Sequence, residues 1–180
     1  RDLLKKDGTT ALLVTHDQHE AFALADSVGV MSAGTVEQWD TAWRLYHQPR
    51  SRRVANFVGQ GCFLHGRLTQ RDGLSLLITE IGELPIRDPS DLAMASVCAA
   101  LDGSLMVLLR PDDVVHDDAS LITGEIIRKA FRGAQFLYTL RLPSGSEVLT
   151  LLPSHHNHDH GEAIGIRLDA DHVVTFKSTS

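Results

Sequence analysis

Residues 11–38 read ALLVTHDQHEAFALADSVGVMSAGTVEQ, and two kinds of regular structure meet within them. The apolar run inside residues 10–15 ends abruptly before His16, which is typical of a buried parallel β-strand. Beyond it, apolar residues recur at helical spacing, and Asp17 with a glutamate three residues later has the form of a capping box. His16 therefore falls where a strand gives way to a helix, which is the ligand-binding edge of an open α/β sheet.

His16 is the first candidate functional residue. Its imidazole could hydrogen-bond a phosphate or a reacting water, because histidine can donate or accept a hydrogen bond near neutral pH. A plainer alternative is that His16 only closes the turn between the strand and the helix. The residues by themselves leave both interpretations open.

Length, charge and cysteine content limit the possible classes of protein. The chain has 180 residues and a net charge of −6, so it could hold one ordinary domain or two small ones. The acidic balance argues against nucleic acid as the main partner. Cys62 and Cys98 are far apart and lack CxxC spacing, which favours a reducing cytosol over a disulfide framework. No apolar run approaches the ~20 residues that a membrane-spanning helix needs.

The first third of the chain is predicted to mix helices and short strands. It starts in what reads as the end of a helix stopped by Gly8, which suggests a fragment of a longer protein. The turn residues Ala33-Gly34 favour a hairpin, and Asp40 is a candidate cap for the helix that follows it. The helices are expected at residues 1–7, 18–26, 41–47 and 51–58, and the strands at residues 10–15, 27–31 and 35–39.

From Gly59 onward, short apolar runs alternate with turn residues such as Asp72-Gly73 and Ser144-Gly145. This regular alternation predicts a small antiparallel barrel or a pair of barrels. The strands are expected at residues 63–68, 74–79, 84–87, 97–101, 105–110, 122–131, 135–142, 147–152, 163–168 and 173–176.

The segment VTHDQHEAFALAD at residues 14–26, followed by GTVEQ at 34–38, resembles the ATP-binding subunits of ABC importers. In that family a strand, a Thr-His-Asp sequence, a Glu-Ala helix and a Gly-x-x-x-Gln hairpin follow one another. The resemblance implies that His16 is the switch histidine, which positions the attacking water against the γ-phosphate of ATP in the complete domain, with Mg²⁺ as the second cofactor.

Other parts of an ATP site do not occur in these 180 residues: there is no GxxxxGK[ST] loop, no pair of Walker B carboxylates and no LSGGQ signature. The full-length parent is therefore expected to be an ATPase. The chain by itself is expected to require no cofactor, and neither to bind MgATP well nor to hydrolyse it.

Three segments of the second half resemble the TOBE accessory domain of these importers, a transport-associated OB-like domain. The implied fold class is mixed: a truncated α/β tail of a nucleotide-binding domain over residues 1–58, then an all-β, OB-like barrel domain over residues 59–180. The segments are LLRPDDV at 108–114, GEIIRKAFRGAQFLYTLRLPSG at 124–145 and GEAIGIRLDADHVVTF at 161–176.

The function implied by the resemblance is that of a regulatory and dimerisation module. The expected partners are a second copy of the chain, membrane permease subunits and, indirectly, a periplasmic or lipoprotein solute-binding protein, at the cytoplasmic face of the cell membrane. GQGCFLHGRL at 59–68 and EQWDT at 37–41 are most similar to the ferric-iron importers. Sugar, polyamine, sulfate and molybdate importers share the architecture and are the alternatives, with an accessory domain that binds a small ligand.

Two functions of other classes compete with this interpretation. A free-standing enzyme using His16 with Asp17 or Glu20 is disfavoured, because no nucleophile or substrate pocket is evident nearby. An oxyanion-binding domain would need converging hydroxyl and amide donors, some of which residues 144–146 could provide.

A histidine-rich tract, SHHNHDH, occupies residues 154–160. It lies between a proline and a glycine, so it is expected to be an exposed loop without preset ligand geometry. A solvated polar loop is therefore the main alternative to a site for Zn²⁺, Ni²⁺ or ferric iron. The candidate metal ligands are His155, His156, His158 and His160.

Pairs of aspartates at 112–113 and 117–118 flank His116. A cation site is conceivable there, but without calcium-loop spacing the aspartates are expected to cap surface turns. Cys62 could be a redox handle, although a small buried apolar residue is the expected role.

Overall fold

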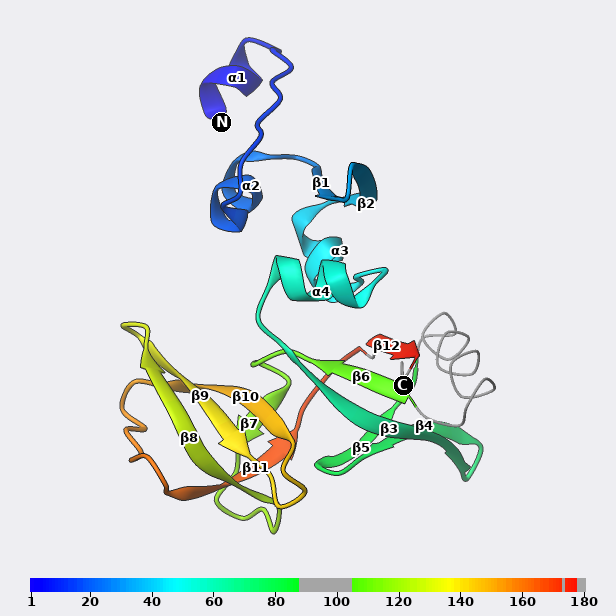
Figure 1. The fold of residues 1–180 in the computed structure, drawn as a ribbon, viewed down its shortest axis with the longest axis vertical. Coiled ribbons are helices and arrows are strands. Elements are labelled where there is room, and N and C mark those ends of the chain that lie inside the picture. The colour runs from blue at the N-terminus through cyan, green and yellow to red at the C-terminus, as the bar shows by residue number, and fades with distance from the viewer. Residues whose placement is uncertain (88–104, 173, 178–180) are drawn as a thin grey trace. The chain divides into compact units, whose positions relative to one another are not determined.

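The computed structural model describes residues 1–87, 105–172 and 174–177, and the chain divides into two compact units, residues 1–59 and 60–180. Figure 1 shows α-helices labelled in the first unit and only strands labelled in the second. Among the described residues, no helix is long and apolar enough to cross a membrane.

The smaller unit combines four short helices with a two-stranded antiparallel hairpin. Its buried core is small and consists of Val30, Leu45, Val54 and Val58, with Phe22 packed against them. The elements are α1 (Asp2–Lys6), α2 (Gln18–Leu24), β1 (Val28–Ser32), β2 (Thr35–Asp40), α3 (Ala42–His47) and α4 (Arg52–Val58).

Local sequence explains most of these boundaries. Ala33 and Gly34 both have positive φ, 47° and 79°, as a two-residue hairpin turn requires. The cap of α3 differs from the expectation, because the Thr41 hydroxyl, and not Asp40, accepts the hydrogen bond from the Arg44 N–H at 3.3 Å. The Asp40 carboxylate instead accepts from the N–H of Thr41 at 2.9 Å.

The strand expected at residues 10–15 is absent from the structure, and this prediction is corrected. The segment is irregular, and Leu12 and Val14 are 84% and 88% exposed. A strand needs a neighbour to accept its main-chain hydrogen bonds, and no described strand pairs with this segment. The expected helix ends two residues earlier than predicted, at Leu24.

The larger unit contains two five-stranded sheets whose neighbouring strands are all antiparallel. One has the order β10-β9-β8-β11-β7 and the other the order β12-β6-β3-β4-β5 (Figure 1). The strands are β3 (Cys62–Arg71), β4 (Leu74–Thr79), β5 (Gly82–Pro85), β6 (Leu105–Leu109), β7 (Val114–His116), β8 (Thr123–Phe131), β9 (Gln135–Arg141), β10 (Glu147–Pro153), β11 (Ala163–Leu168) and β12 (Val174–Lys177).

Both sheets contribute to one buried apolar core. Leu64 and Leu77 from the second sheet belong to the same cluster as Tyr138, Leu140 and Ile166 from the first. Burial of this shared apolar surface is the main force that holds the two sheets together. The larger unit therefore folds around a single core.

The mixed fold class, with an all-β second half, is confirmed. Each predicted strand of that half that falls on described residues is present, although the one expected at 84–87 lies at Gly82–Pro85. The strand expected at 97–101 and Cys98 lie outside the described residues. Strand β7 was not predicted.

Candidate functional site

The Thr-His-Asp bend leads into α2 through a set of local hydrogen bonds. The Asp17 carboxylate accepts from the N–H of His19 at 2.7 Å and from that of Glu20 at 3.4 Å, so it caps the helix. The Glu20 carboxylate accepts from the Thr15 hydroxyl at 2.8 Å, and the Thr15 hydroxyl accepts from the Asp17 N–H at 3.0 Å. The predicted capping box is thus present in an altered form, extended by one hydroxyl.

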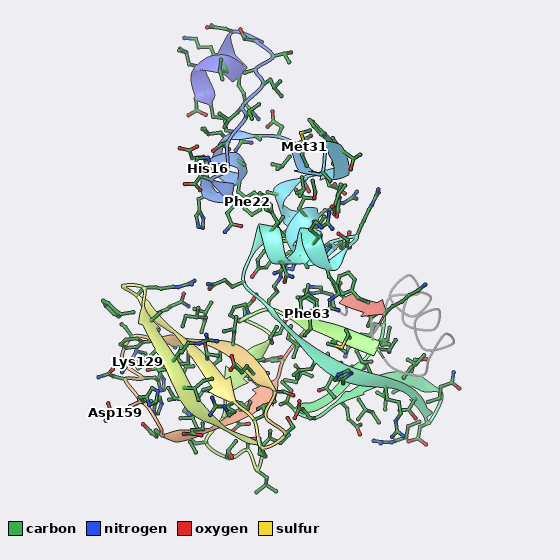
Figure 2. The ribbon with its side chains drawn as sticks, viewed as in Figure 1. His16, Phe22, Met31, Phe63, Lys129 and Asp159 are labelled. Atoms are coloured by element: carbon green, nitrogen blue, oxygen red, sulfur yellow. The ribbon has the colours of Figure 1, made fainter. Side chains whose placement is uncertain are left out.

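His16 stands at the apex of this bend and is exposed. Together with Asp17, Gln18, His19 and Phe57 it lines an open hollow of the smaller unit. Figure 2 labels His16 beside α2. The hydrogen bonds of Asp17 hold the bend in which His16 lies, and the imidazole of His16 is exposed, so it is accessible to a ligand.

The four histidines of the 154–160 tract do not act as one set. The tract follows β10, and its residues alternate in burial: His156 and His158 are half-buried, whereas His155 and His160 are exposed. The rings of His155 and His156 are tilted against each other with centroids 4.5 Å apart, and the Nε2 of His160 lies 3.0 Å from the main-chain oxygen of Ile127. The structure therefore distinguishes the half-buried pair of predicted ligands from the exposed pair by burial.

A third histidine joins the inner pair from a distant part of the sequence. His116 ends β7, and its ring centroid lies 5.4 Å from that of His156 and 5.3 Å from that of His158. One ligand nitrogen from each of the three rings lies within 4.8 Å of the others. His116, His156 and His158 thus form a histidine triad, which is a candidate metal-binding group.

Tyr138 fixes the main chain of the loop that carries two triad members. This residue of β9 is buried, and its hydroxyl donates to the main-chain oxygen of His156 at 2.8 Å. The same hydroxyl accepts from the N–H of His158 at 3.1 Å. Lys129 of β8 adds a bond to the main-chain oxygen of His158 at 2.7 Å, and Figure 2 labels this lysine on its strand.

Carboxylates contact two of the triad rings. The Nδ1 of His158 lies 2.8 Å from the Glu162 carboxylate, and the Nε2 of His116 lies 3.1 Å from the Asp118 carboxylate. The main-chain N–H of Asp159 also donates to Glu162 at 2.9 Å. These contacts orient both imidazoles, as carboxylate partners do in protein metal sites.

Protonation equilibria around the triad follow from the same contacts. Loss of hydration, together with the neighbouring histidines, lowers the pKa of His156. The hydrogen bond from the Asp159 N–H, followed by the contact with His158, lowers the pKa of Glu162. The neutral imidazole, which is the form that binds metals, is favoured at His156.

Of two other candidate residues, Cys62 is half-buried against the core and Asp113 is buried. Burial raises the pKa of the Cys62 thiol to about 11, which favours the protonated form and makes a redox handle unsuitable there. Asp113, expected in a surface turn, is only 7% exposed and accepts a 2.7 Å hydrogen bond from the N–H of Arg110. The prediction that Asp113 lies in a surface turn was wrong, because its carboxylate closes a buried turn after β6. Asp117 does cap a turn, accepting from the Ala119 N–H at 2.9 Å.

The sequence indicates the two loop histidines of the triad better than it indicates His116. Extended chain alternates its side chains, so the i, i+2 spacing of His156 and His158 could have identified them as a pair. No local signal connects His116 to them, because contacts of β7 with β11 and with Thr150 of β10, which are remote in sequence, create that proximity.

Comparison with known proteins matches part of the larger unit to a domain family. Residues 107–176 match the family model described as the TOBE domain. The solved structure of the cytoplasmic molybdate-binding protein ModG gives a TM-score of 0.47 at 13% identity, over 64% of this chain and 95% of that chain.

Curated relatives extend the similarity over most of the chain. The spermidine/putrescine import ATP-binding protein PotA of Oleidesulfovibrio alaskensis is 34% identical over 155 residues, covering 82% of this chain and 40% of that protein. The protein of the same name from Marinobacter nauticus is 32% identical over 152 residues, covering 82% of this chain and 39% of that protein. The Fe(3+) ions import ATP-binding protein FbpC 2 of Pectobacterium atrosepticum is 30% identical over 135 residues, covering 75% of this chain and 35% of that protein.

The chain thus spans about two fifths of the length of the relatives that it matches. The names of these relatives include both polyamine and ferric-iron import, so the narrower similarity to ferric-iron importers stays a prediction. The broader resemblance is confirmed: residues 107–176 form a TOBE domain, and the chain is a relative of the ATP-binding subunits of ABC importers.

Proposed function

We propose that the chain is the C-terminal part of an ATP-binding subunit that energises an importer, with residues 60–180 as its regulatory accessory domain. The TOBE match within this compact unit carries the proposal. The exposed apolar side chains of Leu12 and Val14 support it, because neighbouring strands of a complete nucleotide-binding domain would cover them.

In the complete subunit, His16 acts on the γ-phosphate side of bound MgATP. It contacts the attacking water, and the capped start of α2 holds its main chain in place. The parent subunit supplies the residues that bind ATP and Mg²⁺. One geometric feature supports this role: the imidazole is exposed, and hydrogen bonds hold the bend that carries it.

The test is steady-state ATP hydrolysis by the full-length subunit carrying His16→Ala. We expect kcat to fall by about 100-fold or more, with little change in the KM for ATP, because the imidazole acts on the water and not on nucleotide binding. His19→Ala is the matched control, since His19 lines the same hollow and is expected to leave kcat nearly unchanged. Full activity in His16→Ala would contradict the assigned role.

The accessory domain pairs with that of a second subunit and holds the two nucleotide-binding domains in register. Two-fold pairing is the commonest symmetry of protein oligomers, and sheet-edge strands such as β5 and β12 offer main-chain groups for it. The subunit works at the cytoplasmic face of the membrane, against permease subunits that receive solute from a binding protein. Sedimentation equilibrium tests the pairing, and a full-length subunit that stays monomeric at high concentration would argue against it.

For the transported solute, we propose a polyamine such as spermidine or putrescine, with ferric iron as the second candidate. Relatives whose names specify these polyamines support the first choice, and the relative named for Fe(3+) import supports the second. Uptake of labelled spermidine and of ferric citrate by cells with and without the full-length gene distinguishes them. Loss of ferric uptake alone would reverse the order of the two candidates.

A further inference from the structure

A metal site that differs from the predicted one lies at the end of β7. His116 comes from this strand, His156 and His158 come from the loop after β10, and their ligand nitrogens lie within 4.8 Å of one another. We propose that the histidine triad binds a divalent transition metal ion of the zinc class. Three histidines suffice for such a site, since zinc can hold water in its fourth position.

One atom of the triad lacks the partner that a buried polar group normally has. The Nδ1 of His158 is engaged by the Glu162 carboxylate at 2.8 Å. Its Nε2 is buried and has no hydrogen-bond partner within the described part of the chain. Buried polar atoms are almost always satisfied, so an unsatisfied nitrogen of an imidazole whose centroid lies 5.3 Å from that of His116 and 6.2 Å from that of His156 indicates a ligand position. A bound metal ion would satisfy it.

The surroundings of the triad are those of a prepared site and not of a freely moving loop. Tyr138 bonds to the main chain of both His156 and His158, so its hydroxyl fixes the spacing of the two loop ligands. Glu162 orients the ring of His158 and makes its Nε2 the available nitrogen. Zinc-binding histidines generally have such a carboxylate behind them, where it also raises the basicity of the ligand.

The chemistry of the donors selects the metal. Imidazole nitrogen suits Zn²⁺, Ni²⁺, Cu²⁺ and Co²⁺, whereas hard cations prefer carboxylate and other oxygen ligands. Tetrahedral zinc needs nitrogens about 3.3 Å apart, so ligand nitrogens that lie within 4.8 Å of one another need to approach by at most about 1.5 Å when the triad binds the ion. Rotation of the His156 side chain, with its main chain held by Tyr138, can supply this movement, because the ring is partly exposed.

The direct test is calorimetric titration of the chelator-treated chain with Zn²⁺, repeated with Co²⁺ while the visible spectrum is recorded. We expect one ion per chain and the intense absorption of tetrahedral cobalt. His116→Ala, His156→Ala and His158→Ala should each weaken Zn²⁺ binding by more than about 100-fold, since even outer carboxylate partners are worth about 10- to 100-fold. Glu162→Gln should fall within that smaller range.

Two histidines of the same tract provide matched controls. His155→Ala and His160→Ala should retain the affinity of the parent chain, because neither residue belongs to the group of histidines whose ligand nitrogens lie within 4.8 Å of one another. Loss of binding in these variants, with binding retained in His116→Ala, would show chelation by the tract alone and overturn the proposal. Failure of the parent chain to bind Zn²⁺ would do the same. His116→Gln serves as a second substitution of the same ligand. Circular dichroism of this variant and of the alanine variants, all without metal, checks that each of them is folded.

This site stands independently of the importer function. The titration measures binding by the chain itself, whereas ATP hydrolysis and uptake test the proposed function. A bound ion would connect β7 to the loop after β10, two segments that lie 40 positions apart between His116 and His156. The expected consequence is a higher unfolding temperature of the larger unit in the presence of Zn²⁺.

Discussion

At the scale of single residues, the carboxyl of Asp113 links stability to pH. Burial, with a smaller contribution from the charge of Asp112, raises its pKa from 3.8 to about 6, against opposing effects of the Arg110 N–H and of the positive charges of His172 and Arg110. Between about pH 4 and pH 6 the folded state therefore holds a proton that the unfolded state has lost. The contribution of this proton to the free energy of unfolding is fully present below pH 4 and is lost as the pH rises through 6.

Asp113→Asn isolates this effect, because the amide oxygen can still accept the hydrogen bond from Arg110. The free energy of unfolding of the parent chain should fall by about 2 kcal/mol relative to this variant between pH 4 and pH 7. Urea unfolding at several pH values measures the difference. Asp112→Asn is the exposed control and should show a much smaller trend. Parallel pH profiles for the parent chain and Asp113→Asn would contradict the prediction.

Gly165 of β11 is a second position where one atom decides the local structure. A Cβ added there would collide with the main-chain oxygen of Asp117, whose N–H donates to the oxygen of Gly165 at 2.9 Å. Neither main chain can move without breaking the pairing of β7 with β11. Gly165→Ala should therefore lower the free energy of unfolding by about 3 kcal/mol and weaken Zn²⁺ binding by displacing His116.

The control for this substitution is Gly133→Ala. Gly133 has a positive φ of 80°, but a Cβ added there would meet nothing within 4 Å, so only the conformational cost remains, about 1 kcal/mol. Urea unfolding followed by circular dichroism compares the two variants. Equal destabilisation would show that the close approach at Asp117 is relieved by relaxation.

The candidate site shows how far single residues can be assigned from sequence. A tract rich in histidine is visible at once, and two of its four predicted ligands belong to the triad. The alternation of burial over residues 155–159 separates His156 and His158 from His155, but by its period it would place His160 with them, so the exposure of His160 does not follow from it. His116 joins His156 and His158 through contacts between residues far apart in sequence, which include the β7–β11 ladder and the hydrogen bond from the Leu151 N–H of β10 to the main-chain oxygen of Pro111 at 3.1 Å.

At the scale of elements, Gln38 of β2 organises the connection between α3 and α4. It is 3% exposed, its side-chain amide N–H donates to the main-chain oxygen of Gln48 at 3.1 Å, and its amide oxygen accepts from the Arg50 N–H at 2.8 Å. Gln38→Leu would leave two main-chain groups without these partners. We expect it to lower the free energy of unfolding of the smaller unit by about 2–3 kcal/mol.

Tryptophan fluorescence during urea unfolding measures this loss selectively, because the two tryptophans of the chain, Trp39 and Trp43, both lie in the smaller unit. Gln48→Leu is the control, since Gln48 contributes its main-chain oxygen to the bond and its side chain is exposed. An unchanged transition in Gln38→Leu would mean that water replaces both hydrogen bonds without cost.

Element boundaries were predictable where turn residues mark them. Asp72 and Gly73 both adopt positive φ between β3 and β4, as an Asp-Gly turn predicts, and β4 has the expected limits. The three-residue β7 is too short for a periodic pattern to indicate it. Residues 10–15 show the opposite case, because a strong apolar run predicts a strand whereas the formation of a strand depends on a pairing neighbour.

At the scale of the whole molecule, the two units differ greatly in the size of their cores. The described residues include 17 buried side chains in the core of the larger unit and four in that of the smaller one. Since buried apolar area is the main source of stability, the larger unit should be the more stable of the two. The sequence pattern changes near residue 59 from helices with short strands to many strands. This change predicted two regions, but it did not predict that their cores differ in size.

This inequality predicts two unfolding steps that hydrogen exchange can resolve. With increasing urea, amides in residues 1–59 should lose protection first, while β3, β6, β9 and β11 of the larger unit stay protected. Zn²⁺ should then shift the second step to higher urea and leave the first unchanged, because all three triad histidines belong to residues 60–180. His116→Ala should abolish the shift produced by Zn²⁺, whereas His160→Ala should preserve it. Simultaneous loss of protection in both units would show that they unfold as one cooperative body in spite of their separate cores.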